Sequence, residues 1–409
     1  MNILYITPSF QHPDVRGPNR HYHFIRRLSE RHTITLLTLA RSEVKSEAVA
    51  EMRSYTRGGL FLFDVNGGAD SALAARLGKL PLIGGRMKFQ LGVRDMKKTF
   101  QDLLRQQKFD LVVFHGKSVF RVIKDFNELP MVVDFCDATS MRRRIEMQYA
   151  SFFRKPWLLL RFLQARRTEK RLIAKTPHLA FISHRDRLAT AGANPNTHIL
   201  PIGVDGNYWR RKRPDCQPNC IIFTGVMSYN PNHDAASYLI EKILPLLRQK
   251  ISAMELLIVG RDPKPELREM ARRNPEVTIT GSVADLRPYL ERAAVFAAPL
   301  RVASGMQNKI LEAMAMEVPV VTTPIVAEGL YLDGCGEPPL YKAVRPEEFV
   351  EHIVALLKNK DKRLELAKAG RQFVETNFSW SHSSEILENM CLEAVSNAAK
   401  SKYHGSKDL

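Results

Sequence analysis

The sequence predicts an α/β protein with two Rossmann-like, doubly wound domains that face a central cleft. Short apolar runs alternate with helical stretches through most of the 409 residues. Runs that are apolar on both faces are typical of parallel sheets covered by helices on each side. The series restarts after a polar break, and a chain of this length has room for two domains.

The expected strands follow these apolar runs in order. In the first half they lie at 2–7, 33–39, 60–65, 111–115, 131–136, 178–183 and 198–204, and in the second at 220–225, 255–260, 277–282, 295–300 and 319–324. Strand–helix alternation implies right-handed crossovers. Helices are expected at 346–359, at 361–377 and from about Ser381.

The break between the two series is the stretch 202–219. It is polar, rich in turn formers and without helical period, so we interpret it as an interdomain linker. The expected domains are 1–203 and 204–380. Ligands of such sheets bind beyond the carboxyl ends of the strands, so the loops that follow strands are the candidate site.

Composition narrows the class of protein. No apolar run approaches the ~18 residues that span a bilayer. The chain opens as a strand rather than as a signal peptide, so a soluble cytoplasmic protein is expected. The five cysteines are scattered and are expected to be reduced thiols.

The net charge of +18 is concentrated in one segment. Between Met141 and Lys175, eleven Lys and Arg residues oppose two acids, with aromatic residues such as Phe152, Phe153 and Trp157 among them. Basic residues with exposed aromatics suit an anionic membrane surface. The competing interpretations are nucleic-acid binding and a solvated helix face whose apolar residues are core.

Several enzyme classes lack their motifs. No GxGxxG follows the first strand, which argues against a dinucleotide enzyme. Neither HExxH nor GxSxG occurs. No two aspartates lie two residues apart, so a DxD clamp for a metal and a diphosphate is absent, and we expect no metal and no cofactor.

The loop after the first strand is long and contains Gly17, and a helix is expected to begin near Asn19. Helix N-termini bind phosphate through unpaired N–H groups, and glycine lets a ligand approach the backbone closely. The alternative is an ordinary connection whose glycine relieves a turn.

Three polar residues lie at the ends of later strands. His115 ends an apolar run and could act as an acid, a base or a hydrogen-bond partner near neutral pH, although a lone histidine is more often structural. Asp134 and Asp137 lie at the end of the next strand. They could bind sugar hydroxyls or cap the following helix.

The most informative stretch is "ASGMQNKILEAMA", which follows the strand at 295–300. Ser304, Gly305, Met306 and Gln307 would offer backbone N–H groups at a helix that begins near Asn308, a site of diphosphate size. Lys309 and Glu312 share one face of that helix. Lysine neutralises phosphate, and the glutamate could reach past it to a ribose, which suits a nucleotide-sugar. The alternative is an exposed Lys–Glu pair on an amphipathic helix.

The stretch 298–330 resembles the nucleotide-sugar motif of GT-B glycosyltransferases, the retaining group 1 (family 4) enzymes, and above all their bacterial polysaccharide branch. "FTGVMSYNPNHDAASYLIEKILP", "LLIVGRDP" and "ILPIGVD" support the resemblance, which covers essentially the whole chain. It implies that 1–203 is the acceptor-side domain, that 204–380 binds the nucleotide-sugar, and that a final helix at about 381–400 packs back on the first domain.

The resemblance also implies roles for individual residues. Glu312 matches the family glutamate that contacts the ribose, and Lys309 with the loop 304–307 matches the diphosphate side. Gly17 matches the N-terminal glycine loop, and His115 a histidine near the sugar, so His115 and Glu312 are the expected catalytic residues.

The sequence departs from the family pattern at two places, the contact to the sugar and the positive charge near the diphosphate. Ser304 stands where relatives carry a second glutamate, eight residues before Glu312. The basic pair expected after the strand at 220–225 is missing, and Arg261 and Arg301 are expected to supply that charge instead.

The function that follows is transfer of a sugar from a nucleoside-diphosphate sugar to a lipid-linked or polysaccharide acceptor, with retention, in bacterial cell-surface glycan synthesis. Donor, acceptor and an anionic membrane surface are the expected partners, and nucleic acid is not. The alternatives are an epimerase or hydrolase of nucleotide-sugars and a non-catalytic binding scaffold.

Overall fold

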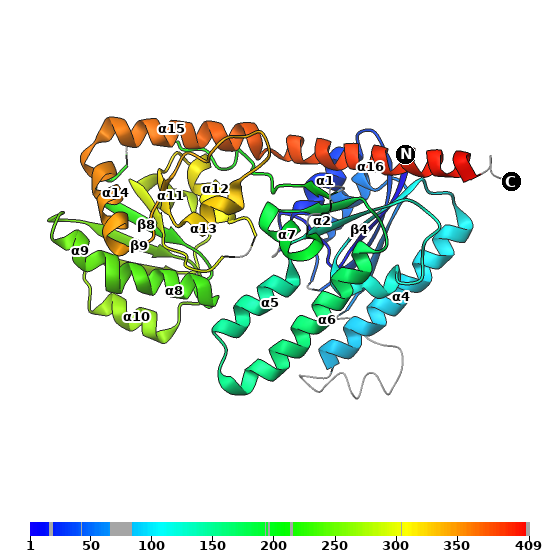
Figure 1. Ribbon diagram of the computed structural model, residues 1–409, viewed down its shortest axis with the longest axis horizontal. Helices are drawn as coiled ribbons and strands as arrows, with labels where there is room; N and C mark the ends of the chain where they lie inside the picture. Colours follow the sequence, from blue (N-terminus) through cyan, green and yellow to red (C-terminus); the bar gives the residue numbers. More distant parts are fainter. Residues whose placement is uncertain are drawn as a thin grey trace.

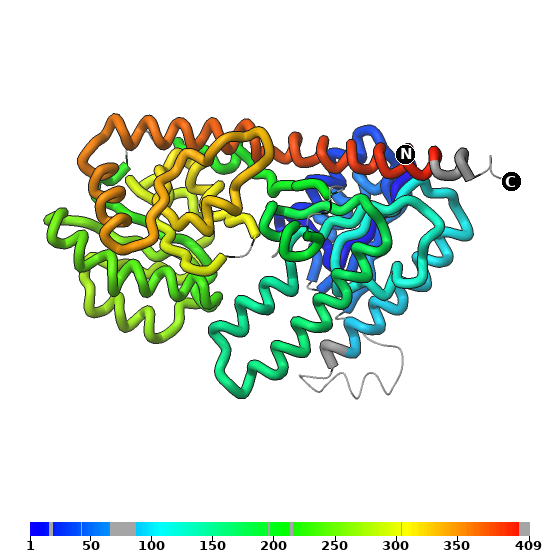
Figure 2. Tube along the Cα trace, viewed as in Figure 1, coloured from blue at the N-terminus to red at the C-terminus, as the bar shows by residue number. Residues whose placement is uncertain are grey.

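The chain folds into two α/β lobes, each built on a parallel sheet, in a computed structural model (Figure 1). The structure describes residues 1–15, 19–41, 43–65, 84–192, 194, 197–212, 216–303 and 305–405, without the side chains of 84–86 and 401–405. In Figure 2 the trace passes from the N-terminal lobe to the C-terminal lobe and returns along one side of both.

The N-terminal lobe contains, among its described residues, a seven-stranded sheet in the order β3-β2-β1-β4-β5-β6-β7. Its strands are β1 (Asn2–Thr7), β2 (Thr33–Ala40), β3 (Gly59–Asp64), β4 (Leu111–His115), β5 (Met131–Cys136), β6 (Leu179–Phe181) and β7 (Thr197–Ile199). Its helices are α1 (Arg20–Leu28), α2 (Ser46–Tyr55), α4 (Gly84–Gln106), α5 (Thr139–Gln148), α6 (Lys155–Ile173) and α7 (His184–Ala191).

The strand β1 shows why this sheet needs helices on both faces. Leu4 and Ile6 enter the hydrophobic core on one side, whereas Ile3 and Tyr5 enter the core on the other. All four side chains are fully buried. Alternate residues of a strand point to opposite faces, so an apolar run without alternation can be buried only between two layers.

The C-terminal lobe contains, where it is described, a six-stranded sheet in the order β10-β9-β8-β11-β12-β13. Its strands are β8 (Cys220–Thr224), β9 (Glu255–Val259), β10 (Val277–Gly281), β11 (Val295–Ala298), β12 (Val320–Thr322) and β13 (Tyr341–Lys342). Its helices are α8 (Asn230–Tyr238), α9 (Leu244–Arg248), α10 (Pro265–Arg272), α11 (Arg287–Arg292), α12 (Asn308–Ala315), α13 (Pro324–Ala327), α14 (Pro346–Lys358) and α15 (Lys360–Asn377).

The last helix, α16 (Trp380–Gly405), continues from α15 and lies along the N-terminal lobe (Figure 1). Trp380 stacks on His23 of α1 with ring centroids 4.1 Å apart. A Cβ on Gly203 would lie 2.3 Å from the Trp380 ring, so the returning chain packs directly against the linker. Arg371 of α15 secures the linker further by donating to Gly206 O (2.8 Å).

The predicted fold class is confirmed, since both sheets are parallel and covered by helices. In each sheet the chain order reverses beside the first strand, between β1 and β4 and between β8 and β11, and ligands bind at such reversals. All five cysteines are free thiols. Among the described residues, no helix is both long and apolar enough to cross a bilayer.

Candidate active site

The carboxyl ends of β8 and β9 and the N-terminus of α12 surround a cavity of about 530 Å³. We call it the donor cavity, because the sequence predicts that a nucleotide-sugar donor binds at this place. Its lining residues come from four loops of the C-terminal lobe: Thr224, Gly225, Val226, Tyr229, Asn232, Val259, Gly260, Arg261, Ser282, Val283, Leu286, Met306, Gln307, Asn308, Lys309 and Glu312. The first N–H groups of a helix lack a partner within the helix and suit an anion. In α12 this applies to Asn308 and Lys309, since Ile310 N donates to Gln307 O (3.0 Å).

Two glycines allow the strand ends to approach each other at the floor of this cavity. Gly260 has φ +147°, and a Cβ there would lie 1.8 Å from the carbonyl oxygen of Gly225. A Cβ on Gly225 would lie 2.7 Å from the Asn232 amide nitrogen and 3.1 Å from Lys309 Nζ. Larger residues at either position would displace the groups that form the cavity.

Lys309 projects from the first turn of α12 into the donor cavity. Its ammonium group donates to Asn232 Oδ1 and lies 4.9 Å from the centre of the Phe223 ring. Asn232 Nδ2 donates in turn to Val226 O (3.0 Å), which fixes the amide. Burial lowers the pKa of Lys309 to about 7, against the opposing effect of the Glu312 carboxylate.

Glu312, one turn after Lys309, connects the donor cavity with a second cavity. Burial raises the pKa of its carboxyl group to about 7, and Lys309 opposes this rise. The second cavity, of about 500 Å³, lies between the lobes and also contains His23, Asp205 and Trp380. Asn308 and Glu312 line both cavities, so the two adjoin.

The loop before α12 faces the N-terminal lobe. Gly305 has φ +60°, and a Cβ there would lie 3.5 Å from Asp186 Oδ2. Met306 is buried, and Met306 and Gln307 line the donor cavity. Ser304, which the sequence analysis placed on the donor, lies outside the described residues, as does Gly17.

The two arginines expected to supply positive charge lie in different places. Arg261 lines the donor cavity and forms an ion pair with Asp262 (3.4 Å). Arg301 lies on the other side of the 301–307 loop, where its Nε donates to Asp234 Oδ2 (3.0 Å), and it does not line the donor cavity.

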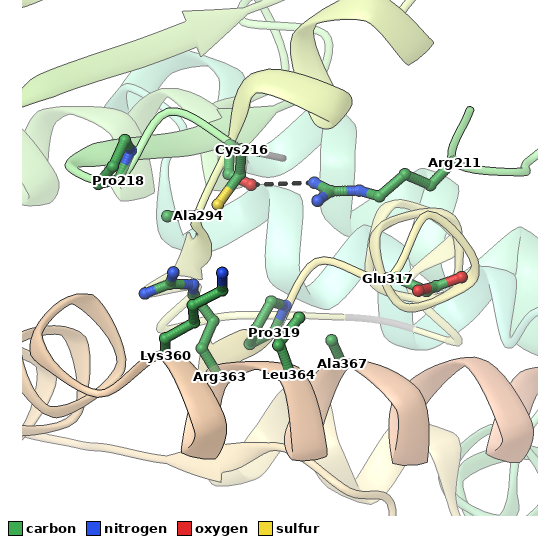
Figure 3. A pocket seen from close by; sticks show the side chains of 11 residues that line it. Arg211, Cys216, Pro218, Ala294, Glu317, Pro319, Lys360, Arg363, Leu364 and Ala367 are labelled. Atoms are coloured by element: carbon green, nitrogen blue, oxygen red, sulfur yellow. Dashed lines mark hydrogen bonds between the residues drawn. The ribbon is translucent and has the colours of Figure 1, made fainter. Parts of the chain in front are cut away.

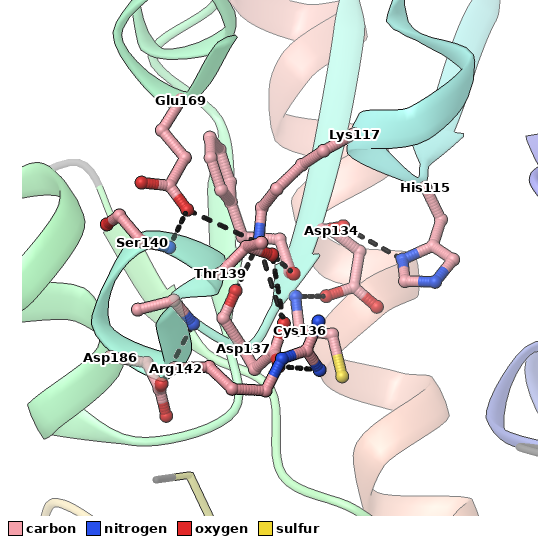
Figure 4. Close-up of polar contacts among 12 residues, drawn as sticks. His115, Lys117, Asp134, Cys136, Asp137, Thr139, Ser140, Arg142, Glu169 and Asp186 are labelled. Atoms are coloured by element: carbon pink, nitrogen blue, oxygen red, sulfur yellow. Dashed lines mark hydrogen bonds and ion pairs between the residues drawn. The ribbon is translucent and has the colours of Figure 1, made fainter. Parts of the chain in front are cut away.

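His115 ends β4 in the N-terminal lobe (Figure 4). Its Nδ1 lies 3.0 Å from Asp134 O, and its ring lies 4.0 Å from that of His21. Burial lowers the pKa of His115, and the Asp134 carboxylate opposes this effect. A neutral imidazole that donates from Nδ1 would leave Nε2 as an acceptor.

Asp134 is committed to structure rather than to a cavity. Its side chain is 1% exposed, accepts from Arg20 Nε (3.0 Å) and accepts from Cys136 N (2.8 Å). His21, His115 and Asp134 offer ligand atoms within 4.8 Å of one another. The Arg20 guanidinium already provides the positive charge that this carboxylate needs, which disfavours a metal ion there.

Asp137 belongs to a polar network around Lys117 (Figure 4). Arg142 Nη1 donates to its carboxylate (2.6 Å), and Lys117 Nζ donates to its main-chain carbonyl and to Thr139 Oγ1 (2.9 Å). Neither Asp134 nor Asp137 caps α5, whose N-cap residue is Ala138 without a side-chain bond. Instead, Asp186 accepts from Ala138 N (2.9 Å).

Arg185 of α7 links the two lobes beside the donor loop. It donates to Ala303 O (2.9 Å) and Ile325 O (2.8 Å), and it forms an ion pair with Glu328 (3.1 Å). The segment after β6 therefore faces the loop that precedes α12. This is the place where a donor held by the C-terminal lobe would meet N-terminal residues.

A smaller cavity of about 170 Å³ behind the C-terminal lobe is a poor candidate (Figure 3). Both arginines among its lining residues are used on main-chain carbonyls. Arg211 donates to Glu291 O (3.0 Å) and Ala293 O (3.2 Å), and Arg363 donates to Leu356 O (2.9 Å). These groups hold the linker and α14 in place and are not available to a ligand.

Asn232, Asn308 and Arg185 were not predicted from the sequence as residues of the site. The segment after β8 carries no basic residue in place of the expected pair. The structure instead places the Asn232 amide there, and its oxygen accepts from Lys309 of α12. The motif "NPN" in that segment was the available signal. No sequence motif marks Arg185, because its partners Ala303 O and Ile325 O are main-chain carbonyls, which every residue type offers.

The part of the chain that forms the donor cavity matches a known protein family. Residues 218–359, which include the whole donor cavity, match the family described as glycosyl transferases group 1. A search of curated protein sequences gives no significant match.

Solved structures share the fold over nearly the whole chain. The Anabaena protein HepE in complex with UDP and glucose has a TM-score of 0.64 at 14% identity, over 95% of this chain and 98% of its own. Sucrose-phosphate synthase from Thermosynechococcus elongatus has a TM-score of 0.66 at 15% identity, over 97% and 99%.

A glycosyltransferase from Rickettsia africae has a TM-score of 0.64 at 13% identity, over 97% of this chain and 99% of its own. The architecture is therefore that of GT-B glycosyltransferases. Together, the domain match and these neighbours support a transferase.

Proposed function

We propose that this chain is a retaining glycosyltransferase that moves a sugar from a nucleoside-diphosphate sugar to an acceptor. The observation that carries the proposal is the donor cavity within the matched domain. There, Lys309 and the N-terminus of α12 face the same space, and Glu312 lies one turn further along the helix. Cationic and anionic side chains on one wall suit a ligand with both a diphosphate and free hydroxyls.

In this proposal the α12 N-terminus and Lys309 stabilise the departing nucleoside diphosphate, and no metal ion is needed. Glu312 would contact the ribose while Lys309 contacts phosphate, since both side chains line the donor cavity. Binding of the anion would favour the charged form of Lys309, whose pKa burial lowers to about 7.

The reacting sugar would lie toward the N-terminal lobe, near His115. An acceptor oxygen bonds to the anomeric carbon as the bond from that carbon to the diphosphate breaks. The acceptor proton passes to the released phosphate oxygen, so the acceptor attacks from the face that the diphosphate leaves. Attack on this face accounts for retention without a protein nucleophile. Packing of the two lobes around the sugar would exclude water and limit hydrolysis.

We further propose that the protein works at the cytoplasmic face of a bacterial membrane, in cell-surface glycan synthesis, on a lipid-linked acceptor. Phe152 and Phe153 are 80% and 91% exposed at the tip between α5 and α6, and Trp157 is 49% exposed beside them. Arg154, Lys155 and Arg161 lie in the same segment. Exposed aromatics among cations favour an anionic lipid surface over solvent.

Product analysis tests the transferase directly. Purified protein is incubated with UDP-, GDP-, ADP- and CDP-sugars, with and without a bacterial lipid extract as the source of acceptor. We expect nucleoside diphosphate release that depends on the extract, and an NMR spectrum of the product with the anomeric configuration of the donor. Equal release without extract would indicate a hydrolase, an altered donor sugar an epimerase, and donor binding without turnover a scaffold.

A further inference from the structure

A third cavity, of about 780 Å³, lies between α5 and the C-terminal lobe and has no role in the donor site. We propose that it binds the acceptor, through an anionic phosphate attached to an aliphatic chain. This inference rests on the proposed transferase and assigns its acceptor a chemical class and a place. We call the space the acceptor cavity.

The position of the acceptor cavity relates it to the donor loop. Its C-terminal wall includes Arg301, Val302 and Ala303, which directly precede the loop that reaches α12. Arg185, which lines the same cavity, holds Ala303 through its carbonyl oxygen (2.9 Å). The donor and acceptor cavities share no lining residue, so both ligands could bind at once on either side of one loop.

The walls of the acceptor cavity are mainly apolar. Met141 and Ile145 of α5 face Val302 and Ile325 across it. Thr323 contributes a hydroxyl, but that group already donates to Leu300 O (2.7 Å). The other polar residues of the walls are Gln148, Glu328 and three arginines. An aliphatic chain would be stabilised by burial against the apolar part of the walls.

One cation of this cavity has no partner within the part of the chain that the structure describes. Arg185 is paired with Glu328, and Arg301 is paired with Asp234. Arg144 of α5 forms no hydrogen bond or ion pair with any residue that the structure describes. A guanidinium group beside an apolar wall suits a phosphate, which it can bind with two parallel hydrogen bonds.

The helix that carries Arg144 also leads to the exposed aromatic tip. The helix α5 ends at Gln148, and the short 3-10 turn Phe152–Arg154 leads into α6. The two helices pack together as a hairpin. In Figure 1 this hairpin extends beyond the body of both lobes. A lipid molecule that contacts the tip would therefore lie near the acceptor cavity, because α5 leads to the tip and also lines the cavity.

Calorimetric titration with octyl phosphate, kept below its micelle concentration, tests the inference on the full chain. We expect saturable binding of one molecule per chain, with inorganic phosphate and neutral octyl glucoside at least tenfold weaker. Arg144→Ala should weaken octyl phosphate at least tenfold. The matched control is Arg53→Ala, which removes an exposed arginine from α2 and should bind like the wild type.

A second variant distinguishes binding in the acceptor cavity from binding at the tip. Octyl phosphate should bind equally to wild type and to the double variant Phe152→Ser, Phe153→Ser, because a single molecule would enter the cavity. Equal binding by Arg144→Ala and wild type, loss of binding in the double variant, or inorganic phosphate as strong as octyl phosphate would each overturn the inference.

Failure of this inference can be distinguished from failure of the transferase. If the wild type turns over a nucleotide-sugar but does not bind octyl phosphate, the acceptor cavity is wrong and the transferase stands. If no nucleotide-sugar binds at all, the transferase fails, and the acceptor cavity loses its basis with it.

Discussion

Lys309 and Asn232 form the most informative contact of the donor site. Sequence reasoning placed Lys309 near phosphate from its position in the first turn of a helix. It could not find Asn232, because the contact joins residues 77 positions apart on two different helices. Arg301 shows the same difficulty, since only the folded loop decides that it faces Asp234 rather than the donor cavity.

Asn232→Ala should weaken nucleotide binding about tenfold, because Lys309 loses the partner that directs it into the cavity, and one hydrogen bond to a charged group contributes about 1.5–3 kcal/mol. The matched control is Asn230→Ala on the same helix, whose side chain accepts from Lys264 (2.8 Å) outside the donor cavity. Titration with UDP compares the two. Equal affinities in both variants would contradict the role of Asn232.

The elements were predictable to different degrees. Long apolar runs identified β1 to β12, because a strand buried on both faces needs such a run. The strand β13, Tyr341–Lys342, was missed because two residues at a sheet edge produce no pattern. The long 198–204 run becomes the three-residue β7, since Leu200 and Pro201 supply carbonyls to Arg20 instead.

The strand end at Gly260 is the element on which the donor cavity most depends. Gly260→Ala should lower the melting temperature by several degrees and abolish nucleotide binding, because its Cβ would collide with Gly225 O. The matched control is Gly281→Ala, at φ +70°, where a Cβ meets nothing within 4 Å. That variant should cost only about 1–2 kcal/mol of backbone strain and keep nucleotide binding. Similar losses in both variants would refute the close approach.

The two lobes together place an exposed aromatic tip at the end of the α5–α6 hairpin, which also lines the acceptor cavity, and charge counting anticipated this arrangement only in part. The sequence located the basic segment but left open whether its apolar residues were core. The structure divides them, since Leu158 and Leu172 are buried while Phe152, Phe153 and Trp157 are exposed. Which side chains of α6 are buried depends on how this helix packs against α5, and the sequence alone does not give that packing.

Liposome sedimentation tests the membrane surface. The wild type should bind phosphatidylglycerol vesicles at low salt and leave phosphatidylcholine vesicles unbound. The double variant Phe152→Ser, Phe153→Ser should bind at least tenfold more weakly, because burying each phenylalanine contributes about 1.5–3 kcal/mol. Leu392→Ser, which alters an exposed leucine on α16, serves as the control and should bind normally. A wild type that ignores anionic vesicles, or that binds DNA instead, would contradict the membrane role.

The central claim is that the donor cavity binds a nucleoside diphosphate through Lys309. Calorimetric titration of the wild type and Lys309→Met with UDP, GDP, ADP and CDP tests it most directly, since methionine keeps much of the side-chain volume without the charge. We expect one site per chain for at least one nucleotide, weakened tenfold or more in Lys309→Met, with unchanged thermal unfolding. Equal affinity in the two proteins, or no binding of any of the four nucleotides to the wild type, would contradict the account.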